Sequence, residues 1–301
     1  MAVVAAPRTD QEFASSTLVR EQASLWRDGL RRLRRNRLAL IAAVYLILLG
    51  IVAIVALFWT PYPTAAIGVA QIYSGPSGAH LLGADELGRD LLSRLMAGAQ
   101  ISLSVGLLSA AIVLGIGVIV GLTAGYFRGW VDGIISTVIN IFYGIPALLV
   151  ALLMVTVLGR SFSNVVIAIS ATVWMDVARL VRGQTLSLRE REYVEAARAS
   201  GARSGKILFG HILPNALGPI IVAVTFVIPS AILFEAFLSY LGVGIPPPTP
   251  TWGAIASEGV QALRLSPHIL LFPSIALSLT LLAFNFLGDG LRDAFDPRQK
   301  R

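Results

Sequence analysis

The residues of this chain that could bind a phosphate group do not form a complete nucleotide site. Gly205 and Lys206 resemble the end of a phosphate-binding loop, in which backbone amides and a lysine hold the phosphates of ATP. Ile207 replaces the hydroxyl residue that should follow the lysine, and Ser200 stands where the motif needs glycine. The chain is therefore not expected to bind ATP by this route.

The histidines and carboxylates do not form a catalytic or metal site either. His80, His211 and His268 are isolated in the sequence, without the spacing of metal ligands. No Ser-His-Asp triad or carboxylate pair can be assembled, and the chain has no cysteine to supply a thiolate or a disulfide. We expect a non-catalytic protein without a metal ion or other cofactor of its own.

Polar residues gather instead in one stretch that interrupts an otherwise apolar chain. Ser187 and Glu190 have the spacing of a capping box, which predicts the start of a short charged helix. Gly201 supplies the left-handed residue that ends this helix. Ser204 is expected to cap a second helix, which Pro214 ends or redirects. The segment from Ser187 to Pro214, called the hairpin below, is predicted to be a helix-turn-helix in water.

Composition places the rest of the chain in a membrane. Of the 301 residues, 55% are hydrophobic and only 14% are charged. A hydrocarbon core about 30 Å thick needs roughly 20 apolar residues of helix. The charge-free runs that approach this length are 38–59, 101–127, 133–159, 161–175, 216–234 and 269–288. The predicted fold is an all-α membrane protein with six transmembrane helices.

The fourth run, 161–175, is short for a membrane span. We keep it because the two chain ends would otherwise lie on opposite sides of the membrane, against the charge pattern. Asp176 and Arg179 are then expected at the cytoplasmic rim, where a pair of opposite charges three residues apart is tolerated.

Glycines recur every four residues in the second run, at Gly117, Gly121 and Gly125. This spacing lets one helix face approach the backbone of a neighbour. Close helix packing is the predicted role of these glycines.

Basic residues determine the predicted orientation. With the start of the chain inside, 20 of the 24 Lys and Arg residues fall on the inner side. The positive-inside rule then places both termini and the hairpin in the cytoplasm. This asymmetry and anionic lipid explain the formal net charge of +7, so no nucleic-acid partner is expected.

The runs divide the chain into segments. These are a cytoplasmic amphipathic N-terminal segment 1–37, a first span 38–59, an extracytoplasmic loop 60–100, a five-helix core 101–290 with the cytoplasmic hairpin 187–214, and a cytoplasmic tail 291–301. Near the end of the loop, Leu87, Leu91, Leu92 and Leu95 indicate a short amphipathic helix on the outer membrane surface or against the bundle.

Polar and helix-bending residues in or next to the runs are candidates for a translocation path. Asn140, Tyr143 and Pro146 predict a kink with polar groups at membrane depth. Pro229 predicts a bend in the fifth run, and Glu235 follows at its outer end. The path candidates are Asn140, Tyr143, Pro146, Pro229, Glu235 and Asn285.

The interiors of the six runs contain no Asp, Glu, Lys, Arg or His. Carriers coupled to proton or sodium movement usually retain such groups, although each costs about 2.5–3.5 kcal/mol at the bilayer centre. A solitary channel or secondary carrier is therefore disfavoured. A membrane enzyme would need clustered catalytic side chains, and none is apparent. The remaining class is a membrane conduit that another protein drives.

The hairpin resembles the EAA signature of permease subunits of ATP-binding-cassette (ABC) importers. The matching residues are Glu195, Ala196, Ala197, Gly201, Ile212, Leu213 and Pro214. His211 stands where the general pattern has isoleucine, and His-Ile-Leu-Pro-Asn is similar to the form in the dipeptide, oligopeptide and nickel branch. The resemblance implies a coupling helix that docks on an ATPase. Its implied contact residues are Glu192, Tyr193, Glu195, Ala196, Ala197, Arg198, Gly201, His211, Leu213 and Pro214.

Other segments resemble the same branch over nearly the whole chain. They are 80–90, 125–132, 235–253 and 285–298. Together they are similar to the shorter of two paired permeases, the C-type subunit. The implied fold is the type I importer permease fold in a bacterial inner membrane.

The resemblance also implies partners. These are a B-type permease in a heterodimer, two ATPase subunits or domains that bind ATP and Mg, and an extracytoplasmic substrate-binding protein. The implied solutes are di- or oligopeptides, and nickel complexes, glutathione or haem remain alternatives.

Overall fold

The computed structural model describes Gly29 and residues 31–295, and this part of the chain is almost entirely helical. Its elements are α3 (Arg37–Val55), α4 (Leu91–Phe127), α5 (Gly129–Tyr143), α6 (Ala147–Leu158), α7 (Phe162–Arg189), α8 (Glu192–Ala199), α9 (Ser204–Ile207), a π-helical turn (Leu208–Ile212), α10 (Leu213–Tyr240), α11 (Trp252–Gln261) and α12 (His268–Phe295). The expected amphipathic segment before residue 29 and the last six residues of the tail lie outside the described residues.

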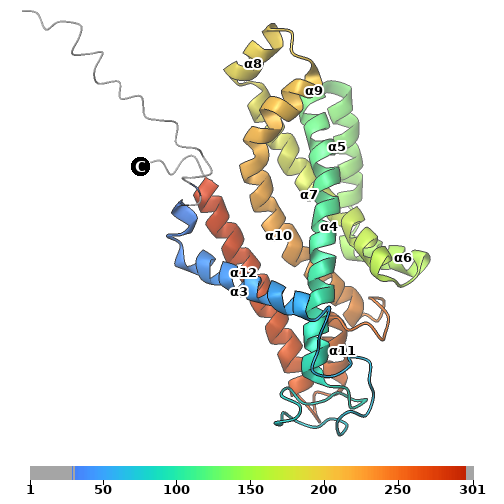
Figure 1. Ribbon diagram of the computed structural model, residues 1–301. Coiled ribbons are helices and arrows are strands. Elements are labelled where there is room, and N and C mark those ends of the chain that lie inside the picture. Colours follow the sequence, from blue (N-terminus) through green and yellow to red (C-terminus); the bar gives the residue numbers. More distant parts are fainter. Residues whose placement is uncertain (1–28, 30, 296–301) are drawn as a thin grey trace, which may run out of the picture.

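The long helices run side by side and give the molecule two distinct ends. Figure 1 shows α4, α5, α7 and α10 together, with α12 and α3 on one flank and α6 on the other. The helices α8 and α9 project at one end, which we call the hairpin end. The long loop before α4 and the short helix α11 lie at the opposite end, which we call the loop end.

In the described part of the chain, five helices are long and apolar enough to cross a membrane, and a broken pair could form a sixth span. The break falls in the third run, 133–159, which we expected to be one span. There α5 and α6 meet at an angle of 85° around Gly144 and Pro146. The residue before a proline is disfavoured in the helical conformation, so a helix interruption at this position has a local cause.

Two further expectations about the helices are corrected by the structure. The short fourth run, 161–175, lies in α7. This helix does not end after Met175 but continues through polar residues to Arg189. The amphipathic helix expected near Leu91 is the first part of α4, which Asp90 caps by accepting from the amide of Ser93. The last helix, α12, continues to Phe295 and so includes the first residues of the segment 291–301.

The contact between α4 and α7 is made through the recurring glycines. A Cβ atom at Gly121 would lie 2.6 Å from the carbonyl oxygen of Ala178, and one at Gly125 would lie 2.6 Å from Cβ of Thr185. A Cβ at Gly117 would meet Val177 at 2.8 Å. The predicted packing role is confirmed, because nothing larger than hydrogen fits at these positions.

A buried ion network joins the start of α4 to α11 at the loop end. Asp85 is fully buried and accepts from Nε of Arg89 at 2.6 Å and from Nη1 of Arg94. Arg94 also donates to both carboxylate oxygens of Glu258 in α11, at 2.5 and 2.9 Å. The network ties the loop before α4 to a helix that follows more than 160 residues later.

We expect Gly121→Ala to destabilise the protein by about 1–3 kcal/mol, because the added methyl group overpacks the α4–α7 contact. The matched control is Gly115→Ala, whose new methyl group would meet no atom within 4 Å. Thermal unfolding of the purified protein in detergent measures both variants. Equal midpoints for the two would contradict the close packing.

We expect Asp85→Asn to lower the free energy of unfolding by up to about 3 kcal/mol, because two buried guanidinium groups lose a charge partner. The neighbouring Glu86 is exposed, so Glu86→Gln serves as the control. Denaturant titration in detergent gives both values. An unchanged stability of the Asp85 variant would show that the network does not stabilise the loop end.

Candidate functional site

The hairpin is a short helix, a glycine turn and a second helix that leads directly into α10. The turn residue Gly201 has φ of 78°, the left-handed conformation that was predicted for it. Ser187 lies inside α7, and α8 begins only at Glu192 after Arg191, so the expected capping box is absent. Ser204 is the first residue of α9 and does not cap it. The α7 helix extends past the predicted cap because its side chains pack on α4.

Pro214 does not end the second helix. It lies in the first turn of α10, where its missing N–H is tolerated, and the helix continues to Tyr240. The chain enters α10 through the π-helical turn, whose His211 carbonyl accepts from the side-chain amide of Asn215 at 2.6 Å. Of the two predicted effects of Pro214, ending or redirecting the helix, the structure contradicts the first.

The hairpin is held to the bundle by a few contacts near its base. Val194 is fully buried and belongs to the main hydrophobic core. Arg189 donates to the backbone carbonyl of Tyr126 at 2.6 Å, and Arg128 forms an ion pair with Glu190 at 3.1 Å. These contacts attach the base of the hairpin to the end of α4.

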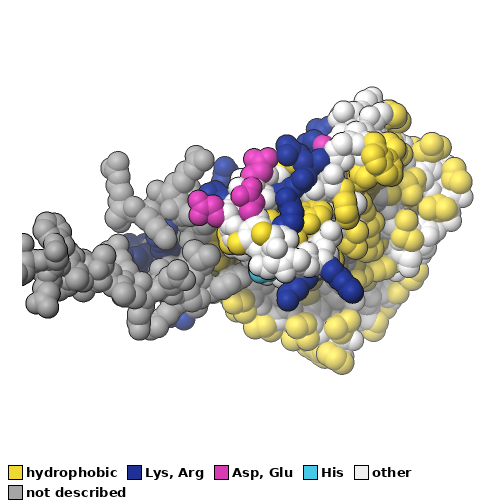
Figure 2. All heavy atoms as spheres, turned by 90° about the horizontal axis from the view of Figure 1, so that it is seen from above, with side chains coloured by type: hydrophobic (Ala, Val, Ile, Leu, Met, Phe, Trp, Pro, Cys, Tyr) yellow, Lys and Arg dark blue, Asp and Glu magenta, His cyan; other side chains and the backbone are white. Residues whose placement is uncertain are grey.

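Most hairpin residues implied in coupling are exposed. Figure 2 shows acidic and basic side chains gathered over the hairpin end. The exposed members of the set are Glu192, Tyr193, Glu195, Ala196, Arg198, Gly201 and Pro214, and the half-buried members are Ala197, His211 and Leu213. Partial burial raises the pKa of Tyr193, an effect that the charge of Arg191 opposes. The tyrosine is thus a neutral hydrogen-bonding group on a charged helix.

A second group of polar side chains lies where α5 breaks, against the middle of α7. Tyr143 donates its hydroxyl to Oδ1 of Asp176, and the guanidinium of Arg179 lies 3.8 Å from the centre of the Tyr143 ring. Arg179 also donates to Oδ1 of Asn140 at 2.7 Å. All four side chains are exposed in the isolated chain. We call Asn140, Tyr143, Asp176 and Arg179 the polar cluster.

Asp176 and Arg179, which were expected at the cytoplasmic rim, lie within α7 and not at its end. Asp176 precedes the end of α7 at Arg189 by about 20 Å along the helix axis. In the described part of the chain no ion pair joins the two side chains, because Tyr143 lies in contact with both. The contacts of these two residues with α5 have no signal in the sequence, because the charge-free run ends before Asp176.

A groove of about 310 Å³ lies beside the polar cluster, between α7 and α10. Asp176 and Ser230 supply its polar groups, and both are exposed. Its lining residues are Val173, Asp176, Val177, Ala223, Phe226, Val227, Ser230 and Phe234. The groove thus combines one carboxylate with an apolar and aromatic wall.

Pro146 lies at the break, next to the polar cluster. The other path candidates, Pro229, Glu235 and Asn285, do not belong to the cluster. Glu235 is fully buried and accepts from Oγ of Ser239 at 2.6 Å, inside the packing at the loop end. Pro229 is also buried within α10. Asn285 is exposed on α12, which packs against α3 and α10. Of the six path candidates, Asn140 and Tyr143 belong to the polar cluster, and Pro146 follows them at the break.

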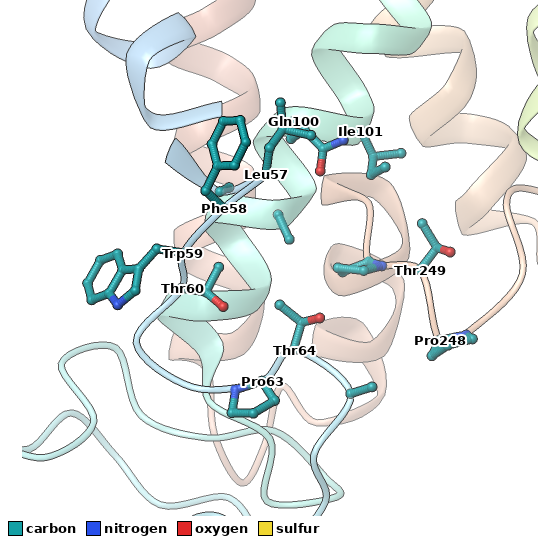
Figure 3. A pocket seen from close by; sticks show the side chains of 14 residues that line it. Leu57, Phe58, Trp59, Thr60, Pro63, Thr64, Gln100, Ile101, Pro248 and Thr249 are labelled. Atoms are coloured by element: carbon teal, nitrogen blue, oxygen red, sulfur yellow. The ribbon is translucent and has the colours of Figure 1, made fainter. Parts of the chain in front are cut away.

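Another hollow of about 520 Å³ lies at the loop end, between the end of α3, the start of α4 and the proline-rich loop. Figure 3 shows Leu57 and Phe58 on one side of it and Pro248 and Thr249 on the other. Its lining residues include no Asp, Glu, Lys, Arg or His. The described residues also contain no group of three His, Asp or Glu that could hold a metal ion.

Comparison with protein families gives two matches along the chain. Residues 117–301 match the model described as "Binding-protein-dependent transport system inner membrane component". Residues 24–76 match the model described as "N-terminal TM domain of oligopeptide transport permease C".

Curated relatives match over more than nine-tenths of the chain. The oligopeptide transport system permease protein of Bacillus subtilis is 40% identical over 282 residues, 94% of this chain and 92% of the relative. The dipeptide permease of the same organism is 40% identical over 289 residues, 95% of this chain and 90% of the relative. The glutathione permease of Pectobacterium atrosepticum is 42% identical over 276 residues, 91% and 92% of the two chains.

A solved structure shows the same fold. A chain of the inward-facing MetNI methionine ABC transporter superposes with a TM-score of 0.57 at 21% identity, over 67% of this chain and 96% of that one. The expected type I permease fold is confirmed.

We expect Val194→Ala to loosen the hairpin, because the buried side chain loses about 1.5 kcal/mol of apolar burial. Amide hydrogen exchange of residues 192–200 should then accelerate about tenfold. The exposed Ala196→Ser is the control. If both variants exchange at the wild-type rate, Val194 does not anchor the hairpin.

Proposed function

Because the chain belongs to the family of binding-protein-dependent transport system inner membrane components, we propose that it forms half of a peptide translocation path that ATP drives through the hairpin. As a member of this family it is a permease component of an ABC importer. The observation that carries the proposal is the combination of an exposed hairpin on α7 with a polar cluster midway along the same helix.

The geometry of the hairpin supports a coupling role. Its charged face is free to contact another protein, while Val194 and Arg189 hold its base to the bundle. Gly201 allows the tight turn between the two helices. A partner ATPase that moves the hairpin would therefore move α7 with it.

The polar cluster supports a role for this face in the path. A charged side chain at the centre of a lipid-facing helix costs about 2.5–3.5 kcal/mol, so charged groups at membrane depth usually line a cavity or meet a partner. Here two charges in the middle of α7 and two neutral polar groups in the last turn of α5 are exposed. This face is therefore suited to water and a polar solute.

In the proposed cycle, ATP binding closes the partner ATPases and displaces the hairpin as a rigid unit. The displacement reaches α4 through the glycine contact. It reaches α5 through Arg182, which donates to both carboxylate oxygens of Asp132 at 2.5 and 2.7 Å. The helices then turn the path from inward-facing to outward-facing, the bound solute enters, and hydrolysis resets the transporter.

The proposed assembly contains a second, B-type permease, two ATPase subunits or domains that hold ATP and Mg, and an extracytoplasmic substrate-binding protein. This chain performs no catalysis in the proposal. Di- or oligopeptides are the proposed solutes, supported by relatives named as oligopeptide and dipeptide permeases. A relative named as a glutathione permease supports glutathione as an alternative solute.

The proposed location is a bacterial inner membrane, with the hairpin and both termini in the cytoplasm. The support is the charge asymmetry of the sequence, in which 20 of the 24 Lys and Arg residues fall in the segments predicted to lie inside. Lipid then surrounds the apolar flanks of the bundle.

We expect Gly201→Val to uncouple ATP hydrolysis from transport. Its φ of 78° is strained for a residue with a side chain, so the turn between α8 and α9 should change shape. ATP-dependent peptide uptake by the complete transporter in proteoliposomes should fall at least about tenfold while the protein still inserts. The control is Gly50→Val in α3, where the new side chain meets no neighbour. Wild-type uptake by the Gly201 variant would refute coupling through this turn.

A further inference from the structure

The polar cluster holds two opposite charges close together without neutralising either by a direct ion pair. Asp176 and Arg179 are one turn apart on α7, and Tyr143 contacts both. Opposite charges at this spacing on a helix ordinarily attract each other. Here the tyrosine hydroxyl binds the carboxylate and its ring lies against the guanidinium, so both groups keep donor or acceptor capacity for another molecule.

The groove beside the cluster provides room for such a molecule. Asp176 belongs to both the cluster and the groove, and Ser230 faces the same space from α10. The volume of about 310 Å³ is at the lower end of the range for small-molecule sites. Phe226 and Phe234 line the same groove as the carboxylate. Aromatic ring faces also attract cations.

Arg179 completes the charge pattern. Its guanidinium is oriented by Asn140 and by the Tyr143 ring, and the remaining N–H groups are suited to a carboxylate. The negative group thus lies in the groove and the positive group lies one turn nearer the hairpin end. A ligand with an ammonium group and a carboxylate matches both.

We propose that the polar cluster and the groove form a binding station for zwitterionic solutes, in which Asp176 receives the ammonium group and Arg179 the carboxylate. This inference rests on the proposed function, since it names the part of the path that recognises the two charged ends of a peptide. The permease itself would then select solutes by their charged ends. This selection would add to the selection made by the substrate-binding protein that delivers the solute.

The absence of cysteine from the chain allows a direct test at one introduced thiol. Ser230→Cys places this thiol in the groove, and the complete transporter is prepared in lipid nanodiscs with cysteine-free partner subunits. Cationic and anionic methanethiosulfonate reagents of equal size then report the local charge by their reaction rates. Rates at Ser77→Cys, an exposed position in the loop before α4, correct for intrinsic reactivity.

We expect Asp176→Asn to lower the ratio of cationic to anionic labelling about threefold or more, and Arg179→Gln to raise it by a similar factor, because each removes one nearby charge. Asp289→Asn, an exposed position on α12, should leave the ratio unchanged. Trialanine should slow labelling of Ser230→Cys, while the same peptide with an acetylated amino end and an amidated carboxyl end should not.

Three results would overturn the station. They are no labelling by either reagent, a labelling ratio that neither charge variant changes, and equal protection by the free and blocked peptides. ATP dependence of peptide uptake by the wild-type complex in proteoliposomes is measured in parallel. If uptake proceeds without ATP, the proposed function fails even when the labelling ratios respond as expected. If uptake needs ATP and the ratios do not respond, only the station fails.

Discussion

The close contact between α4 and α7 supports every other feature of this permease. Three glycines let the two helices approach until the backbone of α7 fills the space that side chains would need. One end of α7 leads into the hairpin, and its middle carries Asp176 and Arg179. The start of α4 is tied by Arg94 to α11 at the opposite end. A rigid helix pair thus connects the charged hairpin, the polar cluster and the loop end.

Rigid packing of α4 on α7 matters for the proposed coupling. A displacement of the hairpin can reach the rest of the bundle only through helices that do not deform. Glycine contacts bring backbones together and leave little void to absorb a displacement. The pair between Arg182 and Asp132 extends the connection to α5, whose last turn holds Asn140 and Tyr143. Motion at α8 would therefore arrive at both halves of the polar cluster, although the two lie on different helices.

The break between α5 and α6 follows directly after the polar residues of α5. The last turn of α5, with Asn140 and Tyr143, lies beside Asp176 and Arg179 of α7. The turn of 85° then directs the apolar helix α6 sideways. One face of the bundle then presents both charges and an aromatic groove, while the flanks stay apolar.

Sequence alone determined the membrane class, the approximate helices, the glycine packing and the hairpin with Gly201 at its turn, because hydrophobic run length, residue size and a left-handed turn are local properties. The caps at Ser187 and Ser204, the end of α7 and a helix end at Pro214 were predicted wrongly, since packing on α4 and α10 outweighs local helix signals. The meeting of Asp176 with Tyr143, and of Arg179 with Asn140, lay beyond sequence reasoning. These contacts join residues more than 30 positions apart, and only the crossing of α5 and α7 brings them within hydrogen-bonding distance.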